Sequence, residues 1–488
     1  MPVEMFTWNA RSAFRNRVAD LRAMESWWES DARDALSIYG RRRVGKSWLL
    51  RAFADGKPAV VLVADRLLVS PQMARFETEL EPALGVRPAI ADVPGLIRAC
   101  YRAGASERVL VIIDEFPYLL PDGAGREGVL SGIQRVMEEE RDRSLTKLVL
   151  CGSLIGQMES LLARDSPLHG RLRPLEVQPM DFAEARALLS ADLGAIEAIE
   201  RYAVTGGMAR YLSELGSGPL REVVCRAVLD RRAPLFDDPR AVLEQELRQL
   251  ASYFSLLEEL SSREASLDHL TRATGVPGNR LSPYLRTLQE MRLVRERLPV
   301  GAAGSGRGRR FRLEDGFIRF WFRFVFPHQD ALDGGLDGGD LWDAHIAPAL
   351  NDHVSATFEM LCLRYARARF GAHAPTIGAW WGDALHAERR SGRRQQEEID
   401  VVGARHRRLR LIGECRWTSR PLDQGVLDEL HQLKLPALHQ ARTLDPDPEI
   451  ETVLFSRAGF TQGLRDRAAG DPRLHLVDPD ELVRGLTH

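Results

Sequence analysis

The sequence predicts an α/β fold built on a parallel β-sheet, followed by a helical segment and further domains. Residues 36–39 form a short apolar strand that runs into a glycine-rich turn and then a helix. Residues 109–113 form a second apolar run, which ends in two carboxylates. Such uninterrupted runs are typical of parallel strands buried on both faces. The chain has 488 residues, 44% of them hydrophobic, so we expect two to four domains.

Charge and composition exclude several classes of protein. The 67 basic and 69 acidic residues give a net charge of −2, which excludes a globally basic nucleic-acid coat but not local patches. We expect a cytoplasmic chain without a membrane partner, since no run of 18 apolar residues occurs and the first residues lack an apolar signal core. Five scattered cysteines predict reduced thiols and no structural zinc.

Residues 40–47 read Gly-Arg-Arg-Arg-Val-Gly-Lys-Ser, the P-loop pattern G-x-x-x-x-G-K-S in its strand–turn–helix context. Gly40 and Gly45 permit backbone conformations that aim N–H groups at phosphate oxygens. We expect Lys46 to reach the β- and γ-phosphates and Ser47 to bind Mg²⁺. The predicted ligands are therefore ATP and Mg²⁺. Their predicted site comprises Gly40, Arg41, Arg42, Arg43, Val44, Gly45, Lys46, Ser47 and Trp48, with Trp48 on the buried face of the helix.

Lysine is rare in this chain, which makes Lys46 informative. Four basic residues are lysines and the other 63 are arginines. Most positions that need only a positive charge have taken arginine, and the two side chains are not interchangeable. A lysine at a mechanistic position therefore indicates a specific demand for an ammonium group.

Asp114 and Glu115 are expected beside the P-loop, because ligands bind at the carboxyl ends of parallel strands. Asp114 would hold Mg²⁺ and Glu115 would orient and polarise the attacking water. Residues 58–64 and 147–153 predict two more strands. Ser153 would sense the γ-phosphate or the water, or is an ordinary strand-end serine. Arg171 would be an arginine finger, in cis or in trans, or is a solvated loop residue.

In order along the chain, G-R-R-R-V-G-K-S, V-I-I-D-E-F, C-G-S, P-L-H-G-R and T-G-G-M-A-R-Y-L resemble the motifs of archaeal-type P-loop ATPases, a prokaryotic family related to AAA+ and STAND ATPases. The resemblance covers roughly residues 10–245. It implies ATP hydrolysis on an AAA+-like sheet, and a Phe-x-x-Arg element that Phe14 and Arg17 match. The sequence departs from the family at His169, where Tyr is usual, and at Ala209, where Pro is usual.

The expected domains are a P-loop ATPase core at 10–180, a helical lid at 181–245, a winged helix at 246–328, a linker at 329–340 and a nuclease-like domain at 341–488. Helical spacing without β-branched runs predicts the lid. Its Gly206-Gly207 turn and Arg210 would face the nucleotide as a second sensor, or would form an ordinary turn between helices.

Residues 253–260, 266–274 and 279–291 predict three helices, and 293–296 and 310–313 predict two strands, which is the winged-helix pattern. The wing carries Arg307, Arg309, Arg310 and Arg312, which would bind phosphates unless the module packs on a neighbouring domain. The aromatic segment 317–326 predicts a buried helix rather than a surface for base stacking.

Near the C-terminus, Asp400 and Glu414 lie on two adjacent predicted strands, where they would share a divalent metal. This arrangement resembles the PD-(D/E)XK (restriction-endonuclease-like) nuclease core, whose last strand would be 452–455. The resemblance implies Glu359 as a further acid and a Lys two residues after Glu414. That position holds Arg416, which stays protonated and cannot act as a base. An active nuclease and an inactive or binding-only domain both remain open.

The sequence therefore predicts an α/β P-loop NTPase with helical lid, winged helix and restriction-endonuclease-like domain. It would hydrolyse ATP with Mg²⁺ and couple nucleotide state to domain rearrangement. DNA or RNA would bind through the winged helix and the arginine-rich C-terminal domain, and the chain would form a homo-oligomer. The alternatives are an ATP-gated nucleic-acid-binding or nuclease effector, and a signalling scaffold that binds ATP without hydrolysing it.

Overall fold

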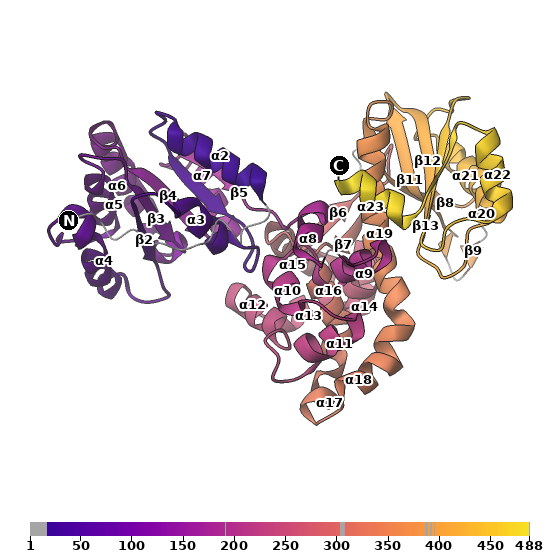
Figure 1. Cartoon of the computed structure of the whole chain (residues 1–488), viewed down its shortest axis with the longest axis horizontal. Coiled ribbons are helices and arrows are strands. Elements are labelled where there is room, and N and C mark those ends of the chain that lie inside the picture. Colours follow the sequence, from indigo (N-terminus) through magenta and orange to yellow (C-terminus); the bar gives the residue numbers. More distant parts are fainter. Residues whose placement is uncertain are drawn as a thin grey trace. The chain divides into compact units, whose positions relative to one another are not determined.

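The computed structural model describes residues 17–190, 192–302, 308–385, 389–390, 393–394 and 396–487, with 389–390 and 393–394 described by their backbone alone. Phe14 and Arg307 lie outside these residues. The chain divides into two compact units (Figure 1). The first runs to Met180 and also includes Met208–Arg210, and the second contains Asp181–Gly207 and the chain from Tyr211 onward.

A five-stranded sheet organises the first unit. Its order is β2-β3-β4-β1-β5 and every pairing is parallel, so the predicted parallel-sheet α/β fold is confirmed. Consequently, the residues that follow β1, β3 and β4 share the carboxyl edge of the sheet. The strands are β1 Ala35–Tyr39, β2 Ala59–Val63, β3 Leu110–Asp114, β4 Lys147–Gly152 and β5 Leu172–Glu176.

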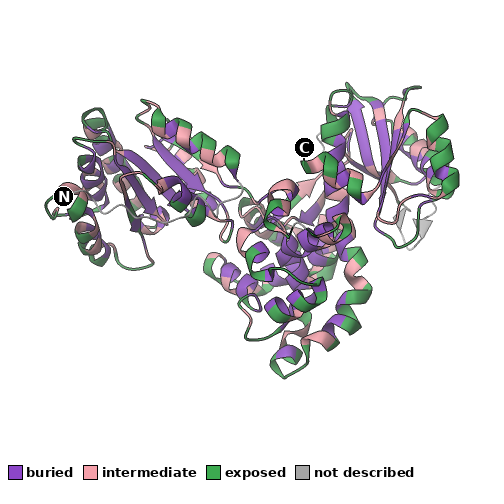
Figure 2. Ribbon diagram, viewed as in Figure 1, coloured by how far each residue is buried: buried purple, intermediate pink, exposed green. Residues whose placement is uncertain are grey.

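Helices bury the strands of this sheet. One face contributes Leu62, Ile113 and Leu150 to a core shared with residues of α4, α5, α6 and α7. The central strands β1, β3 and β4 are almost entirely buried (Figure 2). Asp92 caps α5 by accepting a hydrogen bond from the Gly95 N–H. The helices are α2 Val18–Glu29, α3 Lys46–Ala54, α4 Val69–Leu84, α5 Val93–Ala103, η1 Phe116–Leu119, α6 Gly125–Glu140, η2 Arg141–Arg143 and α7 Ile155–Leu162.

The second unit begins with helices. Asp181 and Glu184 form a capping box, which satisfies two N–H groups at the start of α8. In the described part of this stretch, short helical segments follow one another up to the middle of the chain. These are α8 Phe182–Leu188, α9 Ala195–Thr205, α10 Ala209–Leu215, whose first residues belong to the first unit, α11 Leu220–Val224, η3 Cys225–Leu229 and α12 Asp238–Glu246.

Three helices and an antiparallel strand pair follow, namely α13 Leu250–Ser262, α14 Leu267–Thr274, α15 Gly278–Glu290, β6 Val294–Arg297 and β7 Arg310–Leu313. The strand pair packs on the C-terminal sheet of the same unit. Arg310 pairs with Glu398, and the Trp381 indole N–H donates to the Gly308 carbonyl at 2.7 Å. Arg312 is buried and pairs with Glu264. Arg310 and Arg312 therefore pack against other parts of the protein, which is the second of the two alternatives for the wing arginines.

The aromatic segment is buried, as the sequence predicts. Phe317, Phe320, Trp321 and Phe322 are fully buried, so their rings are not a surface for stacking bases. Residues 329–340, predicted as a linker, contain α17 and the first residues of α18, and Leu332 is buried there. The helices of this region are α16 Gly316–Phe320, η4 Trp321–Val325, η5 Phe326–His328, α17 Gln329–Asp333, α18 Gly338–Leu341, η6 Trp342–Ile346 and α19 Ala347–Phe370.

A second five-stranded sheet ends the chain, in the order β14-β13-β12-β11-β8. Leu427, Leu430, Leu438 and Leu464 cover one face of it. The prediction that 452–455 is the last strand is wrong, because β14 pairs beyond it. The elements are β8 Thr376–Asp383, β9 Arg389–Arg390, β10 Arg393–Arg394, β11 Gln396–Arg405, β12 Arg408–Arg416, α20 Gln424–Glu429, η7 Leu430–Lys434, α21 Leu435–Ala441, β13 Glu451–Ser456, α22 Gln462–Gly470, β14 Leu474–Val477 and α23 Pro479–Thr487.

Across the described ranges, none of the helices combines the length and the apolar character needed to cross a bilayer.

Candidate functional site

The glycine-rich turn lies between β1 and α3. Gly40 has φ +155°, and a Cβ added to it would lie 2.3 Å from the Val177 carbonyl oxygen, so the close approach requires glycine. Gly45 has φ +104° and precedes the first turn of α3. The two predicted glycine positions therefore have the backbone conformation and the close packing that a P-loop needs.

Lys46 starts α3 and folds back over this turn. Its ammonium donates to the carbonyl oxygens of Gly40, at 2.8 Å, and Arg41, at 3.1 Å. The side chain is 7% exposed. Burial lowers the pKa of Lys46, while the nearby Cys151, Glu115 and Asp114 act in the opposite direction. The positive charge is thus held at the centre of the loop.

Ser47 and Asp114 meet although 67 residues separate them. The Ser47 hydroxyl donates to Asp114 Oδ2 at 3.2 Å, and Asp114 Oδ1 accepts the Glu115 N–H at 3.0 Å. A hydroxyl oxygen and a carboxylate oxygen at this spacing fit the ligand preferences of Mg²⁺. The structure therefore brings together the two residues predicted to hold the metal.

Glu115 and Ser153 also meet at this edge. Both the N–H and the hydroxyl of Ser153 donate to Glu115 Oε2, at 3.1 and 2.9 Å. Ser153 is 1% exposed. The Ser153 hydroxyl therefore contacts Glu115, the carboxylate predicted to polarise the water.

The remaining loop residues surround this centre. Arg42 Nη2 donates to the Tyr118 hydroxyl at 2.6 Å, and Arg66 Nε donates to the same oxygen at 3.2 Å. Val44 is fully buried. Trp48 is 51% exposed, so its predicted place on the buried face of the helix is wrong. Arg41 is half-buried and Arg43 is exposed.

Arg17 ties the loop to the end of the sheet. Its guanidinium donates to the Val44 carbonyl at 2.6 Å and to the Gln178 carbonyl at 2.9 Å. The side chain is 3% exposed. The residue that matches the Phe-x-x-Arg element therefore supports the P-loop backbone, and Phe14 lies outside the described residues.

The segment 208–210 also belongs to this site. The Arg210 N–H donates to the Arg43 carbonyl at 3.4 Å. A Cβ added to Gly45 would lie 3.2 Å from Ala209 Cβ. The residues that follow the predicted second-sensor turn therefore contact the P-loop.

Arg171 lies at the opposite edge of the sheet. It precedes Leu172, which is in register with Ala35 at the start of β1, whereas the P-loop follows the end of β1. The strand separates the two by roughly 13 Å. Arg171 forms an ion pair with Glu138 of α6. The prediction that Arg171 acts in cis is therefore wrong. Its action as an arginine finger on another copy of the chain stays a prediction.

In the second unit, Asp400 and Glu414 lie on adjacent strands among cations. Arg416 lies 2.7 Å from Glu414 and 3.4 Å from Asp400, and Lys434 Nζ lies 2.9 Å from Glu414. Burial first, and then the Asp400 charge, raise the pKa of Glu414 to about 7 and that of Glu359 to about 8. Among the described side chains, no group of three or more His, Cys, Asp or Glu is arranged to hold a metal.

Lys434 was missed by the sequence interpretation. It comes from η7, 18 residues after Arg416, so no spacing rule links it to Glu414. Its rarity is the signal that could have found it, because Lys434 is one of four lysines in a chain with 63 arginines.

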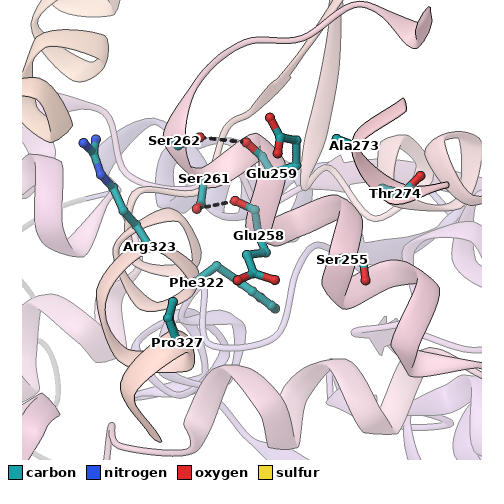
Figure 3. Close-up of a pocket in the computed structure, with 10 residues that line it drawn as sticks. All are labelled: Ser255, Glu258, Glu259, Ser261, Ser262, Ala273, Thr274, Phe322, Arg323 and Pro327. Carbon is teal, nitrogen blue, oxygen red and sulfur yellow. Dashed lines mark hydrogen bonds between the residues drawn. The ribbon is translucent and has the colours of Figure 1, made fainter. Parts of the chain in front are cut away.

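A separate cleft of about 430 Å³ lies within the second unit (Figure 3). Hydroxyl and carboxylate groups dominate its wall, and Ser261 and Ser262 donate to the backbone carbonyls of Glu258 and Glu259. None of the predicted site residues lines it. The lining residues are Ser255, Glu258, Glu259, Ser261, Ser262, Ala273, Thr274, Phe322, Arg323 and Pro327.

A curated protein and two solved structures are similar to this chain. An uncharacterized protein of Methanocaldococcus jannaschii is 23% identical over 412 residues, 83% of this chain and 87% of that protein. A Walker-type ATPase of Pyrococcus abyssi has 18% identity and a TM-score of 0.49, covering 64% of this chain and 97% of that one. The ORC2 protein of Aeropyrum pernix, in ADPNP-ADP complexes, has 15% identity and a TM-score of 0.40, covering 66% and 95%.

Two family models match parts of the chain. Residues 321–427 match Archaea bacterial proteins of unknown function, and residues 83–215 match an ATPase domain predominantly from Archaea. The second match contains Asp114, Glu115 and Ser153 and begins after the P-loop. Together with the loop geometry, it supports an archaeal-type P-loop ATPase, and with it the binding and hydrolysis of ATP.

Proposed function

We propose that the chain is a Mg²⁺-dependent ATPase whose reaction takes place at the carboxyl edge of the first unit's sheet. The observation that carries the proposal is the 3.2 Å contact between Ser47 and Asp114, which joins the P-loop to the end of β3. The ATPase-domain match over residues 83–215 supports the same reaction.

Each residue of the site has a definite task. The turn at 40–45 and the ammonium of Lys46 bind the β- and γ-phosphates. Ser47 and Asp114 would hold Mg²⁺, and a bound Mg²⁺ would neutralise charge that develops on the phosphate oxygens. Glu115 orients the attacking water and accepts its proton. The buried position of Lys46 keeps bulk water away from the cationic centre.

Two substitutions test this proposal. Lys46→Ala abolishes ATP binding, because the buried cation is lost. Glu115→Gln keeps binding and loses turnover, because an amide cannot accept the proton. Binding is followed by isothermal titration calorimetry with a non-hydrolysable ATP analogue, and turnover by phosphate release. Hydrolysis retained in both variants would remove the basis of the proposal, and binding without turnover in the unmodified chain would indicate the scaffold alternative.

We further propose that the nucleotide state acts on the second unit through residues 208–210. This segment groups with the first unit, while the residues on both sides of it group with the second. A change in the P-loop backbone at Arg43 or Gly45 therefore reaches Ala209 and Arg210 directly. Hydrogen exchange of residues 205–212 should slow when ATP and Mg²⁺ are added to the wild-type chain, and should not change in Lys46→Ala.

Binding of DNA or RNA is our second candidate function, and α15 favours it. Arg280 and Arg286 are exposed on this helix, six residues apart, while Leu281, Leu285 and Leu288 form its buried face. ATPase rates measured with and without a panel of DNA and RNA test this function. Stimulation that Arg280→Ala and Arg286→Ala abolish would support it, and an unchanged rate and no gel shift would exclude it.

We do not propose nuclease activity. Glu414 forms ion pairs with Arg416 and Lys434. Asp400 accepts a hydrogen bond from the Cys415 N–H at 2.8 Å and also pairs with Arg416. Two cations already compensate the carboxylates that a metal would need. Cleavage of plasmid or single-stranded DNA with Mg²⁺ or Mn²⁺ that is lost in Asp400→Ala would show the opposite.

A further inference from the structure

Glu115 is anchored on one of its two carboxylate oxygens. The backbone N–H and the hydroxyl of Ser153 both donate to Oε2, at 3.1 and 2.9 Å. The other oxygen, Oε1, accepts no hydrogen bond from the residues that the structure describes. A carboxylate anchored in this way loses its rotational freedom, while one acceptor oxygen remains available.

The local fold is built for this contact. Glu115 has φ 53°, a left-handed conformation that is uncommon for a residue with a side chain, and it precedes η1. A Cβ added to Gly152 would lie 2.8 Å from Pro117 Cδ and 2.8 Å from Met158 Sδ. The end of β4 can therefore approach η1 closely because residue 152 is glycine. This approach places Ser153 against Glu115.

The adjacent carboxylate of Asp114 has different hydrogen-bond partners. Asp114 directs one oxygen to the Glu115 N–H and the other to Ser47, toward the P-loop. The two adjacent carboxylates thus diverge, one toward α3 and the other toward β4. Non-glycine residues in left-handed conformations cluster at functional sites, where the surrounding contacts maintain them.

We infer that Ser153 is a positioning residue, which orients Glu115 for the attacking water instead of contacting the nucleotide. The inference rests on the proposed ATPase function. Ser153 holds Oε2 and thereby directs Oε1 toward the water. A group that only orients the base changes the rate of the chemical step and leaves the affinity for ATP unchanged.

The test is Ser153→Ala in the full-length chain. The variant keeps the N–H donor and loses the hydroxyl donor, so kcat should fall roughly tenfold. KM, and the Kd of a non-hydrolysable ATP analogue measured by isothermal titration calorimetry, should stay within about twofold. Ser37→Ala is the matched control. Ser37 is a fully buried serine of β1 whose hydroxyl has no hydrogen-bond partner among the described residues, and this variant should keep the wild-type kcat.

A double-mutant cycle shows whether Ser153 acts through Glu115. Single-turnover hydrolysis of radiolabelled ATP measures the slow residual rate of Glu115→Gln. Adding Ser153→Ala should change that rate by less than about twofold, because the oriented base is already gone. A similar fall in both backgrounds, a Ser153→Ala kcat equal to or above wild type, or a Kd raised tenfold or more would overturn the inference. A wild-type chain without ATPase activity would instead overturn the proposed function.

Discussion

Lys434 Nζ lies 2.9 Å from Glu414 Oε1, with relative side-chain exposures of 9% and 1%. Arg416 approaches the other oxygen of the same carboxylate at 2.7 Å. The two cations come from different elements, since Arg416 ends β12 and Lys434 ends η7. A buried carboxylate with two cationic partners therefore joins the C-terminal sheet to the helices that cover it.

Lys434→Met should destabilise the second unit by about 3 kcal/mol, because the buried Glu414 carboxylate loses one of its two cationic partners and keeps Arg416 as the other. Urea unfolding measures the loss. The double variant Glu414→Gln, Lys434→Met should lose less stability than Lys434→Met, since the buried carboxylate that lost a partner is removed as well. A double variant that loses the sum of both single effects would show that the ion pair contributes nothing.

Gly40→Ala should weaken ATP binding by about tenfold or more, because the added methyl group would press on the Val177 carbonyl, 2.3 Å away, and move the loop backbone. Isothermal titration calorimetry with a non-hydrolysable ATP analogue measures the effect. Gly56→Ala is the matched control, because Gly56 also has a positive φ, 75°, but nothing lies within 4 Å of an added Cβ. Equal losses of affinity in both variants would point to backbone strain alone.

Arg17→Ala should lower the stability of the first unit by about 2 kcal/mol, because two buried carbonyls lose a charged donor. ATP affinity should fall with it, since the Val44 carbonyl is part of the P-loop. Thermal melts and ATP titrations measure the two effects. The exposed Arg22 of α2 provides the control, and Arg22→Ala should leave both quantities unchanged. Wild-type affinity in Arg17→Ala would separate this residue from the nucleotide site.

His353 should make the second unit sensitive to acid. Its Nε2–H donates to the Ala203 carbonyl at 3.0 Å, and its Nδ1 has no hydrogen-bond partner among the described residues. Burial, and then the charge of Arg319, hold its pKa well below the ordinary histidine value of 6.5. Its contribution to stability is therefore complete above that value and is lost as the pH falls toward the lower pKa of the folded state.

The measurement for His353 is a pair of thermal melts, at about pH 7.5 and about pH 5.5. The Tm of His353→Gln should fall less than that of wild type between the higher and the lower pH, because the amide cannot take up a proton. The two falls in Tm should differ by about 2 °C or more. His373 is exposed, so His373→Gln should behave like wild type. An identical acid response in wild type and His353→Gln would assign the acid sensitivity to other groups.

The local sequence was sufficient to predict a site whose residues are neighbours in the chain. The G-x-x-x-x-G-K-S pattern predicts the glycine turn, and the apolar run before Asp114 predicts a buried parallel strand. Because parallel strands end at the same edge of a sheet, the sequence also predicted that Asp114 lies beside the P-loop. The role of Arg171 stayed open because its motif does not say at which edge of the sheet the residue lies. The structure places Arg171 directly before β5, at the edge where β1 begins. Lys434 was missed because its partner lies on another element, at a separation that only tertiary folding decides.

The four lysines of the chain all have their amines engaged. Lys46 and Lys147 donate to backbone carbonyls, Lys57 to Glu25 and the Phe53 carbonyl, and Lys434 to Glu414. The native fold therefore offers few accessible side-chain amines to acylating reagents or to a lysine-specific protease. Cleavage at each lysine would report the opening of one defined region: the P-loop, the end of α3, the start of β4 or the C-terminal carboxylate cluster.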